Sequence, residues 1–65
     1  MEFEVGKKYI DKREGHYMKG TIIKVVHKFE NYYKFKVLKN ENVYDMSKKE
    51  MLKRFKPLES KVKRL

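Results

Sequence analysis

The sequence predicts a small, mainly β domain of about five antiparallel strands, with one short helix at about residues 48–55 before the last strand. Two segments alternate apolar and polar residues with period two, as half-buried strands do. A serine-led motif further on marks the start of a helix. Five tyrosines and four phenylalanines within a hydrophobic content of 40% supply a core, although 42% of the residues are charged.

The two clearest strands lie at residues 21–29 and 32–39. Alternation places these residues on their apolar faces: Ile23, Val25, His27 and Phe29 in the first, and Tyr33, Phe35 and Val37 in the second. We expect a hairpin in which Val25 lies beside Val37, because this register keeps the apolar residues together. It leaves residues 30–32 as a three-residue loop, whereas a two-residue loop would mix the faces.

Shorter strands complete the predicted sheet. They lie at residues 8–12 and 42–46, and a loop punctuated by two glycines connects the first of them to the hairpin. A last strand at residues 56–59 contains Pro57, which is tolerated at the edge of a sheet. We therefore expect an antiparallel meander with one later edge strand.

The helix is the best-defined local prediction. Ser47 and Glu50 are spaced as a capping box, in which each side chain accepts a backbone N–H of the other residue. Met46 before the cap and Met51 after the first turn are placed to form the accompanying hydrophobic staple. Pro57 disfavours helical geometry at the residue before it, so the helix should end near Phe55.

Length and composition suggest one domain at residues 1–59 and a basic tail at residues 60–65. A chain of 65 residues buries only a modest fraction of its surface. Without cysteine it has no disulfides or thiolate metal sites, and no motif indicates a cofactor. The N-terminal residues contain no long apolar run, so we expect neither a signal peptide nor a membrane span, but a soluble cytoplasmic protein. We also expect a monomer or a weak homodimer.

The order of elements resembles a small SH3-like barrel, with several short antiparallel strands, one long early loop and a brief helix before the last strand. The segment at residues 20–25, Gly-Thr-Ile-Ile-Lys-Val, is similar to the glycine-then-hydrophobic stretch of KOW and Tudor-type barrels. This resemblance implies a fold that binds RNA, DNA or protein tails and rarely catalyses reactions. The composition also resembles that of small lysine-rich proteins of bacteriophages and other mobile elements.

Positive charge indicates nucleic acid as the first partner to consider. The formal net charge is +9, and from Ser47 onward eight basic residues are balanced by only two acidic ones. On the outward face of the hairpin we predict phosphate contacts from lysines and stacking from one tyrosine: Lys24, Lys28, Lys34, Lys36 and Tyr32. The helix and tail add a second basic group: Lys49, Lys53, Arg54, Lys56, Lys61, Lys63 and Arg64. Because lysines greatly outnumber arginines, we expect little sequence preference.

Three alternatives compete with this hypothesis. The lysines can simply be the solvent-exposed residues of a strand face, where their charge also opposes aggregation. The chain can instead be a small inhibitor or adaptor that docks an acidic protein surface through Tyr17 and Met18 in the long loop. Exposure of that pair favours protein binding, whereas its burial beside an open lysine patch favours nucleic acid. Self-association through a free sheet edge is the third alternative.

An enzymatic role is not expected. His16 and His27 are far apart in sequence, and no nucleophile, base and acid occur at recognisable spacing. No pair of histidines or cysteines has the spacing of metal ligands. His27 falls on the predicted core face, where a hydrogen-bonded structural histidine is the simplest interpretation.

Overall fold

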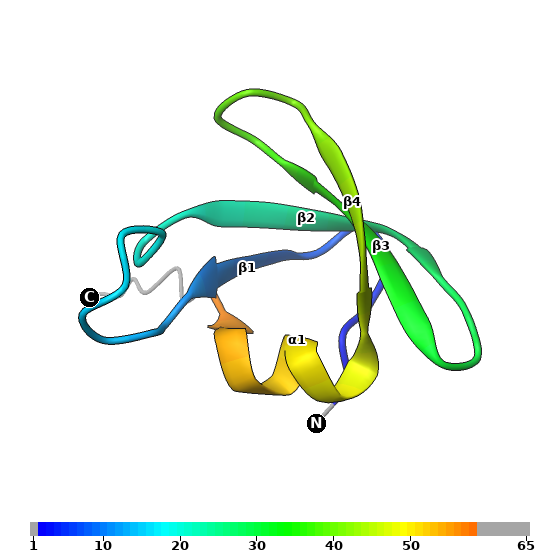
Figure 1. Cartoon of the computed structure of the whole chain (residues 1–65). Helices are drawn as coiled ribbons and strands as arrows, with labels where there is room; N and C mark the ends of the chain where they lie inside the picture. The colour runs from blue at the N-terminus through cyan, green and yellow to red at the C-terminus, as the bar shows by residue number, and fades with distance from the viewer. Residues whose placement is uncertain (1, 59–65) are drawn as a thin grey trace, which may run out of the picture.

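The computed structural model of the chain describes residues 2–58 and shows one antiparallel sheet of five strands with a short helix (Figure 1). The elements in chain order are β1 (Lys8–Asp11), β2 (Ile22–Lys28), β3 (Tyr32–Val37), β4 (Val43–Ser47), α1 (Lys48–Arg54) and β5 (Phe55–Pro57). The strand order is β4-β3-β2-β1-β5. The mainly β class and the helix before the last strand are therefore confirmed. With β4 and β5 at the two edges of a curled sheet, closure into a barrel stays a prediction.

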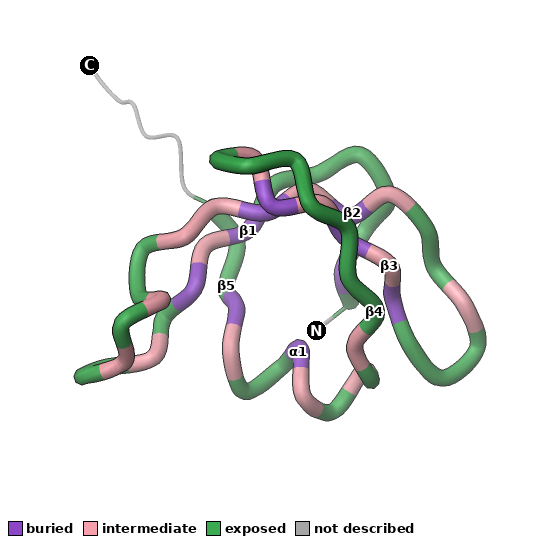
Figure 2. Tube along the Cα trace, turned by 45° about the horizontal axis from the view of Figure 1, so that its top comes forward, coloured by how far each residue is buried: buried purple, intermediate pink, exposed green. Residues whose placement is uncertain are grey.

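The core lies on the concave side of the sheet, where buried residues of the strands face α1 and the N-terminal segment (Figure 2). Phe3 is fully buried and packs edge-to-face on Tyr9 and Tyr33, with ring centroids 4.6 and 5.4 Å apart. Both tyrosine hydroxyls accept backbone hydrogen bonds from this segment, Tyr33 from Phe3 and Tyr9 from Glu4. The segment before β1 thus completes the core without forming a strand.

The β2–β3 hairpin differs from the predicted register. Val25 pairs with Phe35 rather than Val37, and the Phe29 N–H donates to the Tyr32 carbonyl at 2.9 Å, which leaves a two-residue turn. Such a turn alone would oppose apolar and polar residues. A β-bulge between Val25 and His27 corrects this, because Val26 is an extra residue with no partner on β3.

The bulge also reverses the faces beyond it. Val25 is fully buried, so regular alternation would bury His27 as well. Instead His27 is exposed and Lys28 pairs with the buried Tyr33. The predicted core position of His27 is wrong because the sequence pattern carries no mark of the extra residue.

The helix begins as its motif predicts. The Ser47 hydroxyl accepts the Glu50 N–H at 3.2 Å, while the Glu50 carboxylate accepts from Arg54 Nε at 2.8 Å instead of returning to Ser47. Met51 is the fully buried residue of α1. The chain leaves the helix at Phe55 and enters β5, whose Pro57 lies opposite Tyr9 at the sheet edge.

Asp11 is the one buried charged residue of the described chain, and it fixes the base of the β1–β2 loop (residues 12–21). Its carboxylate accepts the Arg13 backbone N–H at 3.0 Å and two guanidinium hydrogen bonds at 3.1 and 2.7 Å. Burial by itself raises the pKa of Asp11, but the hydrogen bonds and charge of Arg13 outweigh it, so the pKa lies below its usual value.

Replacing Arg13 by alanine should lower the free energy of unfolding at pH 7 by about 2 kcal/mol, because it leaves a buried carboxylate without its charged donors. The folded-state pKa of Asp11 is lowered, so the stabilisation is present at neutral pH and is lost as the pH falls below about 4. Urea titrations at pH 7 and pH 3 measure both effects. Lys19→Ala, which breaks the exposed pair with Glu14, is the matched control. If the difference in free energy of unfolding between wild type and Arg13→Ala were as large at pH 3 as at pH 7, the stabilising role of the Arg13–Asp11 pair would be contradicted.

Candidate nucleic-acid interface

A row of three lysines crosses the outer face of the sheet, which we define as the face opposite the core. Lys24 on β2 pairs with Lys8 on β1 and with Lys36 on β3. Residues directly paired across antiparallel strands project to the same face, so these three form one group, here termed the lysine row. Lys8 was not predicted, although its alternation with the buried Tyr9 would have placed it outward.

The next outward position on β3 places a fourth lysine beside the lysine row. Lys34 on β3 lies between His27 on β2 and Asp45 on β4. It is two residues away from Lys36 on the same strand, about 7 Å along it. Within residues 2–58, neither Lys34 nor any member of the lysine row has a carboxylate oxygen within 4.0 Å.

Beside these lysines the outer face carries three stacked rings, here termed the aromatic column: His27, Phe29 and Tyr32. The ring centroids of His27 and Phe29 are 5.1 Å apart at an interplanar angle of 15°. Those of Phe29 and Tyr32 are 4.5 Å apart at 13°. Tyr32 was predicted as a stacking residue. His27 and Phe29 were assigned to the core, and the bulge brings them outward instead.

Lys28 does not share the face of the other hairpin lysines. Because it follows the bulge, it pairs with Tyr33 on the core side, and its ammonium group forms an ion pair with Glu2. The hydrogen bond and charge of this pair lower the pKa of Glu2, and the hydrogen bond raises that of Lys28. The prediction that Lys28 joins the hairpin face is therefore wrong.

The second predicted basic group is divided by the structure. Lys49 and Lys53 are exposed on α1, on the other side of the molecule from the lysine row, and Arg54 is held by Glu50. Lys56 pairs with Ile10 and so belongs to the outer face. Three further residues of the prediction lie outside the described residues: Lys61, Lys63 and Arg64.

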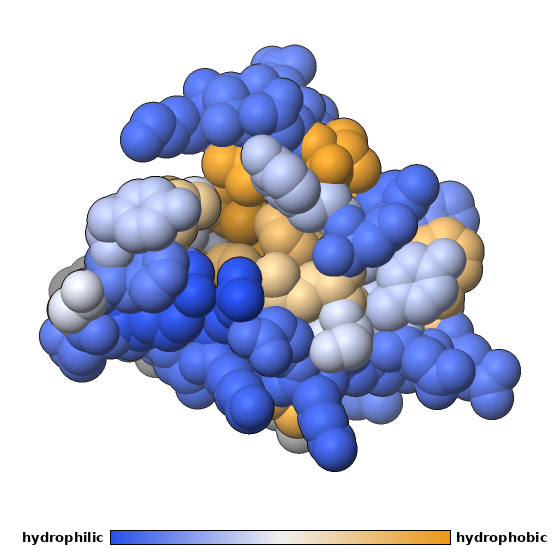
Figure 3. Space-filling view, in the orientation of Figure 1, coloured by the Kyte–Doolittle hydropathy of each residue, from blue (hydrophilic) through white to orange (hydrophobic). Residues whose placement is uncertain are grey.

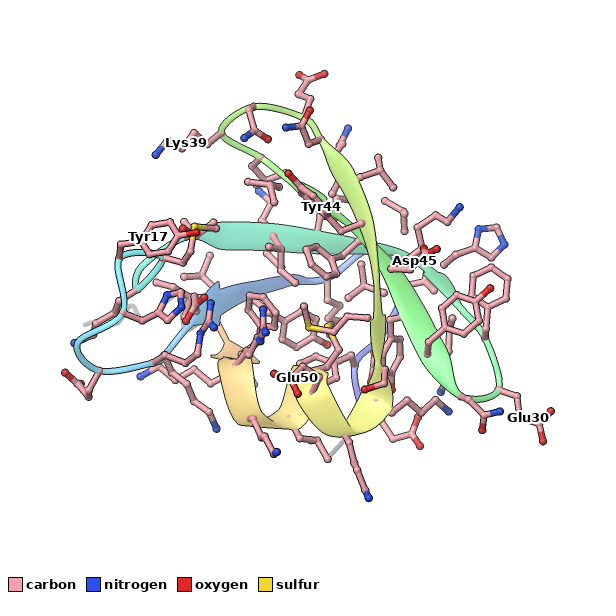
Figure 4. The ribbon with its side chains drawn as sticks, viewed as in Figure 1. Tyr17, Glu30, Lys39, Tyr44, Asp45 and Glu50 are labelled. Carbon is pink, nitrogen blue, oxygen red and sulfur yellow. The ribbon has the colours of Figure 1, made fainter. Side chains whose placement is uncertain are left out.

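A separate cleft of about 430 Å³ opens between the β1–β2 loop, β4 and the end of α1. Figure 3 shows apolar surface in a hollow there, with hydrophilic surface around it. Tyr17 stands on the loop and is 90% exposed, and Tyr44 on β4 is 46% exposed (Figure 4). Met18 also lines the cleft and is half-buried. Of the two residues proposed for protein binding, only Tyr17 is thus open to solvent.

Comparison with protein-family models, with curated proteins and with solved structures found no match for this chain. Across residues 2–58, the histidines and carboxylates form no group of three or more that could hold a metal ion. In the same part of the chain, no helix is long and apolar enough to cross a membrane.

Proposed function

We propose that this protein is a non-catalytic nucleic-acid-binding module whose contact surface is the outer face of the sheet. The observation that carries the proposal is the lysine row, with Lys34 beside it, free of carboxylate partners in the described chain. Like charges on directly opposed strand positions are unfavourable for the isolated sheet. A polyanion relieves this repulsion, and phosphate binding gains further from the release of counterions.

The spacing of the lysines suits several phosphates rather than one compact anion. Neighbouring strands lie about 4.8 Å apart, so the backbone positions of Lys8 and Lys36 are about 10 Å apart. Lys8 is exposed and Lys24 and Lys36 are half-buried. Their long side chains allow each ammonium group to reach a different phosphate. Lysine acts as a mobile point charge with no fixed fork of donors, so the interface should read little sequence.

The fold is compatible with this role. Five antiparallel strands, a long loop between β1 and β2 and a helix before the last strand are the features on which the resemblance to SH3-like barrels rests. That resemblance favours binding of nucleic acid or protein tails. The lysine row favours nucleic acid among these partners.

Replacing Lys24, Lys34 and Lys36 together with glutamine should weaken binding to all sequences and make it less dependent on salt. If each lysine neutralises one phosphate, the slope of log K against log salt should become shallower by about 2 to 3. Fluorescence anisotropy with labelled DNA and RNA oligonucleotides at several salt concentrations measures both quantities.

A second triple variant with the same change of charge is the control. Lys39, Lys49 and Lys53 are exposed and lie off the outer face, so their replacement by glutamine should reduce affinity only through net charge. Loss of binding in this control, with the outer-face variant unaffected, would move the interface to α1. Equal losses in both variants would show that net charge alone drives binding.

Asp45→Asn should tighten nucleic-acid binding by about two- to fivefold at low salt, because Asp45 places a negative charge next to Lys34 on the proposed interface. The gain should fade as salt rises. Glu14→Gln gives the same change of net charge on the β1–β2 loop and is the matched control for the anisotropy titration. An equal gain in both variants would argue against a localised interface.

The exposed Tyr17 beside the apolar cleft favours a second candidate function, docking to an acidic surface of a larger protein as an inhibitor or adaptor. An exposed aromatic ring next to an apolar hollow is a common anchor in protein interfaces.

For this function, Tyr17→Ala should abolish capture of an acidic partner from cell extract while leaving nucleic-acid affinity unchanged. The capture is measured by affinity pull-down at physiological salt. The lysine variants above, which leave the cleft intact, should still capture the partner. Capture that survives Tyr17→Ala would eliminate the cleft as the docking site.

A further inference from the structure

We propose that the ligand of the outer face is single-stranded nucleic acid, with one unpaired base stacking on the imidazole of His27. This inference rests on the proposed function and assigns its substrate class. It is carried by the aromatic column, which lies on the same face as the lysines and which phosphate binding alone does not require.

His27 and Tyr32 are the two end rings of the column, and His27 is the end beside the lysines. Phe29 is stacked between His27 and Tyr32, so both of its faces are occupied. Since Phe29 covers one face of His27, the opposite face is directed back along β2. Alternation before the bulge places Val26 and then Lys24 outward in that direction.

This position offers the two features that a bound nucleotide requires, a flat surface for its base and positive charge for its phosphates. His27 is exposed and offers a flat ring face, and Val26 beside it is half-buried and apolar. Lys34 is the direct cross-strand partner of His27, and Lys24 and Lys36 form the next pair on the outer face of the hairpin. A base on His27 therefore has ammonium groups on two sides for its neighbouring phosphates.

Charge also sets the direction in which the strand leaves this position. The other end of the column, at Tyr32, is next to the hairpin turn, where Glu30 projects into solvent (Figure 4). That carboxylate repels phosphates, whereas the opposite direction leads onto the lysine row. We infer that the strand runs from His27 across Lys24 and Lys36 toward Lys8.

A duplex cannot use this arrangement. Its bases are stacked on one another, so their ring faces are closed to a side chain unless the helix is opened. An unpaired base has a free face, and stacking on an aromatic side chain is tolerant of sequence. The lysines would bind either form, but the column discriminates in favour of the single strand.

The test compares a labelled oligonucleotide with its own duplex by fluorescence anisotropy, for the wild type and three variants. The wild type should bind the single strand at least about tenfold more tightly than the duplex. His27→Ala should lose about tenfold on the single strand and little on the duplex. His27→Phe retains a ring and should restore the preference. Tyr17→Ala removes an exposed ring on the β1–β2 loop and should behave as the wild type.

Stacking has a second, independent readout. A 2-aminopurine base in the single strand should lose fluorescence on binding the wild type and His27→Phe, and lose less on binding His27→Ala. Circular dichroism of each variant establishes that it is folded. Concordant results would assign the base-stacking position to His27.

The anisotropy results distinguish failure of the single-strand inference from failure of the proposed nucleic-acid-binding function. Equal affinity for single strand and duplex, unchanged by His27→Ala but reduced by the triple lysine variant, would overturn the single-strand inference and leave the nucleic-acid function standing. Absence of binding to either form at physiological salt would overturn the proposed function itself. A preference for the duplex would contradict the stacking role directly.

Discussion

One unpaired residue in β2, Val26, determines what the outer surface of this protein can do. A two-residue turn and a continuous apolar face are incompatible in a regular β2–β3 pairing, and the bulge makes them compatible. Before it, Ile23 and Val25 face the core. After it, the alternation of side chains between the two faces is shifted by one residue. The rings of His27 and Phe29 therefore lie with the lysines on the outer face, and Lys28 lies on the core side.

The distribution of ion pairs separates structural cations from free ones. Arg13 is held by Asp11 at the start of the β1–β2 loop, and Lys28 by Glu2 of the N-terminal segment. Arg54 is held by Glu50 one turn earlier within α1. Within residues 2–58, the lysines of the outer face form no ion pair with a carboxylate. A small domain with a net charge of +9 tolerates this self-repulsion at some cost in stability.

The sequence was sufficient to predict the elements but not their exact faces. Period-two patterns identified β2 and β3, and the serine–glutamate spacing identified α1, because these are local constraints. The bulge was not predictable, since Val26 is itself apolar and fits either face of the pattern. The same error put His27 and Lys28 on the wrong faces in the site prediction. The faces of Lys24, Lys34 and Lys36 were predicted correctly, because Lys24 precedes the bulge and the other two lie on β3, which has no bulge. Pairing of Lys8 with Lys24 depends on sheet order, which no local pattern contains.

The pairing of β1 with β5 has a consequence for the order in which the chain can fold during synthesis. Tyr9 and Pro57 are neighbours in the sheet although most of the chain separates them. Strands β1 to β4 can pair as they emerge, but one edge of β1 remains open until residues 55–57 have left the ribosome. Closing so long a loop is slow compared with forming the hairpins. A nascent chain halted before Phe55 would present an unprotected strand edge beside an incomplete core, the combination that promotes association with other chains.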